Sequence, residues 1–153
     1  NQDRGGKPRY MTFTDYIAHK DLGQKTMLFL IDGLYGSEKV NGAPSRKWKM
    51  PPFNNDWPCS LFASQDPVAI DAVGIDFLSS EFPRMADVDY CDMYLVEAAM
   101  ANLPLSNTFY DPERDGTGVK SLGVLEHWNN PIDKKYSRNQ GKDVGIELFY
   151  LRK

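Results

Sequence analysis

The sequence predicts an α/β domain in which helices pack on a small, mixed, mainly parallel sheet that belongs to a larger domain. Residues 27–31 form a continuous apolar run without alternation, which is typical of a strand covered on both faces. Two further segments, 60–64 and 145–151, are rich in strand-forming residues. Helical patterns fall between these strands, and that order favours parallel pairing.

Length and composition are those of one globular domain. The chain has 153 residues, of which 41% are hydrophobic and 25% charged, and this is enough to bury a single core. No apolar run approaches the roughly 18–20 residues that span a bilayer, so we expect no membrane span. The net charge of -3 argues against general nucleic-acid binding, which requires a basic face. Small molecules and proteins are therefore the expected partners.

The N-terminal part combines a tether and a short helix. Residues 1–11 are polar and Gly-rich, so we expect a flexible tether followed by a single α/β domain over 12–153. Thr12 or Thr14 can cap a helix that stops at Gly23. The first strand then ends at Asp32.

A long connection precedes the second strand. Residues 35–59 show no sustained period and contain four prolines and two tryptophans. A connection of this length is usually a functional loop, or it packs on a missing partner.

Two helices follow the strand at 60–64. Asp66 and Pro67 are N-terminal signals for a helix over 67–82, which Pro83 ends because proline lacks the next backbone donor. A second helix is expected over 89–102, and the third strand over 145–151 closes the predicted sheet.

Three aspartates lie five residues apart in and before the first of these helices. Asp66 is expected to cap it. Asp76 precedes Ser79 and Ser80 and is expected on a solvated face. Asp71 lies among apolar neighbours and needs a partner, which is either a neighbouring hydrogen-bonding group or a ligand. Five helical residues turn about 500°, so Asp71 and Asp76 do not share a face.

The predicted parallel sheet brings two acids to one rim. Asp32 ends the first strand and Asp66 follows the second, and ligand crevices of open α/β sheets lie at the carboxyl ends of the strands. Asp32 and Asp66, with Asp71 beside them, would form an oxygen-rich site for a divalent cation such as Mg²⁺ or Ca²⁺.

The other candidate residues lie outside this rim. Glu126, His127 and Trp128 place an acid, an imidazole and an indole side by side, and His19 is the second histidine. Either histidine could be a ligand, a base or a structural hydrogen-bonding group. The segment "DPERDG" at 111–116 mimics the start of a calcium loop, but its proline and the lack of a distal glutamate favour a plain turn.

Several motifs resemble the domain of unknown function family 362, a bacterial and archaeal group: "FLIDGLYG", "KMPPFNNDWPCSLFASQDPVAIDAVGIDFL", "SLGVLEHWNN", "YSRNQG" and "GIELFY". The resemblance runs from about His19 to the end and corresponds to the C-terminal half of the family domain. The resemblance implies that an N-terminal half of the same protein is missing here and is a partner of this domain. Some members of the family carry ferredoxin-like segments, which implies redox-linked chemistry, and many members look exported. Cys59 and Cys91 are the only cysteines, so we expect no iron–sulfur cluster in this chain.

The sequence thus predicts an acidic site for a metal or a polar ligand. In this hypothesis Asp32 and Asp66 hold the cation or ligand and Glu126 also contacts the ligand. Asp71 is a buried orienting acid and His127 a catalytic base.

An alternative hypothesis is a binding module without catalysis, in which Trp48, Trp57 and Trp128 stack on a sugar or contact a protein. A third hypothesis is that residues 35–59 serve only to pack on the absent half.

Overall fold

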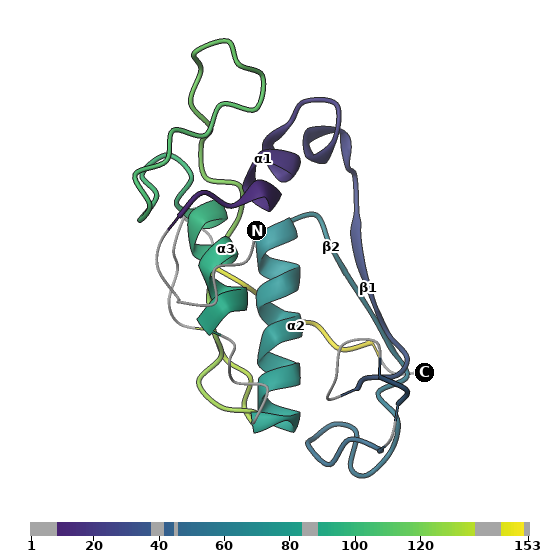
Figure 1. The fold of residues 1–153 in the computed structure, drawn as a ribbon. Coiled ribbons are helices and arrows are strands. Elements are labelled where there is room, and N and C mark those ends of the chain that lie inside the picture. The colour runs from purple at the N-terminus through teal and green to yellow at the C-terminus, as the bar shows by residue number, and fades with distance from the viewer. Residues whose placement is uncertain (1–8, 38–41, 45, 84–88, 137–144, 152–153) are drawn as a thin grey trace.

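A computed structural model describes residues 9–37, 42–44, 46–83, 89–136 and 145–151. In it α2 is the central element: the two strands lie along one side of it, and α3 lies along the other (Figure 1). The elements are α1 (Thr12–Ala18), the short 3-10 helix η1 (Gly23–Lys25), β1 (Phe29–Gly33), β2 (Ser60–Ser64), α2 (Pro67–Glu81) and α3 (Asp89–Ala99). The described ranges contain no helix long and apolar enough to cross a membrane.

The sheet corrects the predicted fold class. β1 and β2 pair antiparallel, from Phe29 opposite Ser64 to Gly33 opposite Ser60, so the prediction of a mainly parallel sheet is wrong. The reason lies in the connection. A parallel pair needs a crossover that returns the chain to the starting end, usually through a helix, whereas residues 34–59 only reverse the chain direction.

The strands are covered on one face. Phe29, Ile31 and Phe62 are partly buried on the α2 side, whereas Leu30 and Leu61 on the opposite face are 57% and 69% exposed. The apolar run at 27–31 therefore does not mark a strand covered on both faces. Among the described helices α2 packs against both strands, and the alternation in burial follows from that.

The predicted helix over 67–82 is confirmed as α2. Asp66 caps its N-terminus, Pro67 occupies the first turn, and the helix ends before Phe82 and Pro83. Its side chains are buried on several sides because the sheet lies on one side and α3 on the other. Two clusters of buried residues make the core: Val68, Ala72, Leu95, Ala98, Ala99, Ala101, Tyr110, Leu122 and Leu125 in one, and Trp48, Met50, Val73, Phe77 and Phe82 in the other.

Of the other predicted elements, the two helices occur and the third strand does not. α1 and α3 occur, but α1 ends at Ala18 and α3 at Ala99, earlier than predicted. The predicted strand at 145–151 is wrong, since in the described part of the chain these residues have no strand pairing. Strand-forming composition is not enough for a strand, which also needs a neighbouring backbone edge in register. Residues 1–8 of the predicted tether lie outside the described part of the chain.

The long connection is folded against the end of α2. Trp48 pairs with Asp56 in an isolated antiparallel bridge, and Trp48 and Met50 are buried. The Glu81 carboxylate of α2 accepts the backbone N–H groups of Lys49 and Met50 at 2.9 and 3.0 Å. These bonds hold the connection beside β1, where it forms a wall of the cavity described next.

Candidate functional pocket

A pocket of about 330 Å³ lies between the inner face of the sheet and α2, and we call it the α2–sheet pocket. Its volume lies within the range of small-molecule sites. It is lined by Ile31, Asp32, Gly33, Tyr35, Gly36, Trp48, Pro58, Phe62, Asp71, Gly74, Ile75, Phe77, Leu78 and Tyr94.

Two glycines allow aromatic rings to form the pocket wall. A Cβ atom at Gly36 would lie 2.2 Å from the Trp48 ring, and a Cβ atom at Gly33 would lie 2.8 Å from the Phe62 ring. Any other residue would push these rings from their places. The third glycine is Gly74 of α2. A Cβ atom there would lie 3.1 Å from the terminal carbon of Ile31.

Asp71 is the polar group of α2 in this pocket. It is partly buried in the middle of α2, and the Tyr94 hydroxyl from α3 donates a hydrogen bond to its carboxylate. The predicted need for a partner is thus met by Tyr94. Asp32 also borders the pocket, but its side chain is exposed and accepts the N–H of Leu34 at 3.0 Å.

The antiparallel sheet separates Asp32 from Asp66. Asp32 pairs with Leu61 near the start of β2, whereas Asp66 follows the other end of that strand. Leu61 and Ser64 are about 10 Å apart along the strand, but two oxygens bound to one hard cation lie within about 5 Å of each other. The rim site predicted from Asp32 and Asp66 therefore does not form.

Asp66 is fully engaged within the fold. One carboxylate oxygen accepts the N–H groups of Val68 and Ala69 at 2.9 Å, and the other accepts the N–H of Val124 at 2.9 Å. It caps α2, as predicted, and also fixes the 122–125 segment to the helix start. It borders a second cavity, about 660 Å³, between β2 and residues 145–151.

Asp76 corrects another prediction, because it is 6% exposed and does not lie on a solvated face. Its Oδ1 lies 2.7 Å from Nδ1 of His127, and its Oδ2 accepts the N–H of Trp128 at 3.1 Å. The tautomer of His127 with the proton on Nδ1 donates a hydrogen bond to this carboxylate. The other ring nitrogen of His127 lies 3.6 Å from Asp92 of α3. A buried carboxylate that orients a half-exposed imidazole is the arrangement of a base and its positioning acid.

The prediction of a solvated face for Asp76 was wrong because it relied on the polar residues Ser79 and Ser80 that follow in the sequence. Its true partner, His127, lies far along the chain, and only the packing of 125–136 on α2 brings them together. The partners of His127 raise its pKa, with the hydrogen bond to Asp76 as the largest cause and the charges of Asp76 and Asp92 adding to it, while burial acts in the opposite direction.

The stability of the protein should depend on pH through His127. Its folded-state pKa is raised above about 6.5, so its contribution is complete below that pH and is lost as the pH rises through the folded value. We expect the free energy of unfolding to fall by roughly 0.5–1 kcal/mol across this window, a range suited to a half-exposed ion pair. Urea unfolding at several pH values measures it. His127→Gln should show a flatter profile, and identical slopes in both proteins would contradict the assignment.

Glu126 serves the fold. It is buried, and its Oε2 accepts the N–H of Ile146 at 2.6 Å. A Cβ atom at Gly145 would lie 3.1 Å from the same oxygen. The carboxylate thus holds the start of the 145–151 segment and lines neither of the two cavities given above.

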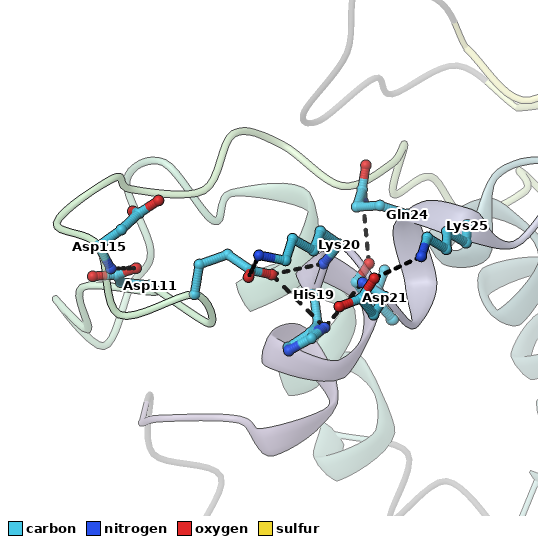
Figure 2. Close-up of polar contacts among 9 residues, drawn as sticks. His19, Lys20, Asp21, Gln24, Lys25, Asp111 and Asp115 are labelled. Atoms are coloured by element: carbon cyan, nitrogen blue, oxygen red, sulfur yellow. Dashed lines mark hydrogen bonds and ion pairs between the residues drawn. The ribbon is translucent and has the colours of Figure 1, made fainter.

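His19 belongs to an ion cluster at the surface (Figure 2). Glu113 accepts the Lys20 N–H at 2.8 Å, pairs with the Lys20 ammonium at 3.0 Å, and lies 3.7 Å from Nδ1 of His19. The turn predicted at 111–116 is confirmed, since Asp111 accepts the N–H groups of Asp115 and Gly116. This cluster fixes the turn to the end of α1. In the ranges that the structure describes, no three His, Cys, Asp or Glu side chains gather closely enough for a metal ion.

The tryptophans do not form one exposed row. Trp48 is 5% exposed and is a wall of the α2–sheet pocket. Trp57 is partly buried against Tyr35, and Trp128 packs edge-on against Phe77. Trp48 is therefore too buried to join Trp57 and Trp128 in an exposed sugar platform.

Comparisons with protein-family models, with curated proteins and with solved structures found no match for this chain. The resemblance to the domain of unknown function family 362 therefore stays a prediction.

Proposed function

We propose that this chain binds a small molecule in the α2–sheet pocket, with an apolar body against the aromatic walls and a polar group at Asp71. The observation that carries the proposal is the pocket itself, about 330 Å³ with mainly apolar and aromatic walls and few polar side chains. Ligand sites commonly combine an apolar cavity with a small number of placed polar groups.

Glycines help to keep this pocket free of side chains. Here Gly74 leaves space on the helix side, and Gly33 and Gly36 set the positions of two rings. The proposal concerns binding. His127 does not line the pocket, so acid–base chemistry by that residue is not part of it.

The test compares two substitutions at Gly74. Ala adds one methyl group near the flexible end of Ile31 and raises helix propensity by about 1 kcal/mol, so we expect Gly74→Ala to stay folded and to keep binding. Leu should fill the pocket, and we expect Gly74→Leu to reduce binding at least ten-fold. Saturation-transfer NMR with a panel of small ring-containing and branched amphiphiles measures the binding.

Near-UV circular dichroism and urea unfolding establish that both variants are folded. Equal binding to folded Gly74→Leu and to the unchanged protein would place the ligand elsewhere and overturn the proposal.

A further inference from the structure

We propose that the ligand of the α2–sheet pocket is an organic cation, an ammonium group with small apolar substituents, which Asp71 and the surrounding aromatic rings recognise. This inference rests on the proposed function. It adds the charge and the chemical class of the ligand.

The described side chains that line the pocket carry charge of one sign only. Among them Asp32 and Asp71 are the charged residues, and no described Lys, Arg or His belongs to the lining. The nearby basic residues of the long connection have other contacts: Arg46 stacks over Phe82 with 4.6 Å to the ring centre, and Lys47 pairs with Asp56 at 2.9 Å. A cation entering the pocket therefore meets the Asp71 carboxylate, whereas the Asp32 carboxylate is exposed at the border and accepts the N–H of Leu34.

Aromatic rings supply the second recognition element. Five of the lining residues are aromatic: Tyr35, Trp48, Phe62, Phe77 and Tyr94. The face of an aromatic ring carries partial negative charge, and a cation within about 6 Å of it gains roughly 0.5–2 kcal/mol, most when it is desolvated. Clusters of such rings around one cavity are suited to alkylated ammonium groups.

The rings are held in place before any ligand arrives. Phe62 packs on Phe77 with 5.3 Å between ring centres, and Trp48 packs on Phe82 with 5.7 Å. A pre-ordered wall lowers the entropic cost of binding. Tyr94 is likewise tied to Asp71 by their hydrogen bond, so the carboxylate has a fixed direction.

The same features argue against a metal ion as the cation. Ca²⁺ requires six to eight oxygen ligands and Mg²⁺ an octahedral set. The pocket walls are mainly carbon, and no metal-binding group of three or more side chains occurs in the described parts of the chain. An organic cation makes use of both the carboxylate and the rings.

A pair of probes that differ only in charge tests the inference. Choline carries a trimethylammonium group, and 3,3-dimethylbutan-1-ol replaces its nitrogen by carbon with the same shape. We expect the protein to bind choline about ten-fold more tightly than the alcohol, measured as dissociation constants by NMR titration. Asp71→Asn should weaken choline binding and leave the alcohol unchanged, while Gly74→Leu should weaken both.

The outcomes separate the two proposals. Equal affinities for the two probes, both lost in Gly74→Leu, would overturn the cationic ligand and leave the binding pocket standing. No binding of choline at millimolar concentration would overturn the cationic ligand, and only the additional failure of the amphiphile panel would overturn the binding pocket. The ratio of the two affinities in the unchanged protein tests the charge of the ligand even if Asp71→Asn fails to fold. Asp32→Asn removes the same charge at the exposed acid and is the matched control.

Discussion

Glu97→Ala is expected to lower the free energy of unfolding by about 3–5 kcal/mol, because it removes a fully buried side chain and leaves its partners unpaired. Glu97 of α3 accepts the N–H of Ser106 at 2.9 Å and the hydroxyl of Tyr110 at 2.8 Å. Tyr110 in turn accepts the N–H of Met11 at 3.0 Å. One carboxylate thus joins α3 to the 104–110 segment and to the start of α1.

The hydrogen bonds from Glu97 through Tyr110 to Met11 predict which part of the fold loosens first. Urea unfolding measures the total loss, and amide hydrogen exchange should show α1 losing protection first, because the Tyr110 hydroxyl no longer has its acceptor. Glu97→Gln keeps the volume and can still bond both partners, so it should lose only about 1 kcal/mol. Equal losses in the two variants would show that the carboxylate charge, and not the filled space and hydrogen bonds, sets the stability.

The sequence predicted the helices better than the sheet. α2 follows from local chemistry, since an Asp-Pro start, an apolar interior and a terminating proline all lie within the segment. The pairing of β1 with β2 depends on how residues 34–59 return the chain, and local pattern does not contain that information. Leu30 and Leu61 are exposed, so the apolar run at 27–31 does not indicate whether one or both faces of the strand are covered.

The candidate site was predictable only in part. Asp71 was identified as a residue needing a partner, because its apolar neighbours are visible in the sequence. Its partner Tyr94 was not, since it belongs to a different helix. The glycines that shape the pocket carry no sequence signal of their own, because what matters at Gly33 and Gly36 is the ring that lies against them.

Asp66, Asp71 and Asp76, which are spaced five residues apart, contact three different parts of the fold. Asp66 faces the 122–125 segment, Asp71 faces Tyr94 and the pocket, and Asp76 faces His127. Successive steps of five residues turn the helix by about 500°, so each carboxylate meets a different neighbour. Polar groups can be buried in such an apolar helix because each one is paired there.

Asp66→Ala is expected to lower the free energy of unfolding by about 2–4 kcal/mol. Loss of a helix cap costs about 0.5–2 kcal/mol, and the buried N–H of Val124 would lose its acceptor, which costs about 1–3 kcal/mol more. Gly123 permits the close approach of the two segments, since a Cβ atom there would lie 2.0 Å from the Asp66 carboxylate. Urea unfolding of the variant measures the loss.

Asp66→Asn separates the two roles of this carboxylate. Asparagine caps helices about as well as aspartate, so the bonds to Val68 and Ala69 should persist. Its amide NH₂ would then face the N–H of Val124, and two donors cannot bond. We expect Asp66→Asn to lose about 1–2 kcal/mol, with faster amide exchange confined to 122–125. A loss as large as that of Asp66→Ala would mean that the negative charge at the helix start, rather than the two sets of hydrogen bonds, determines how firmly α2 is held.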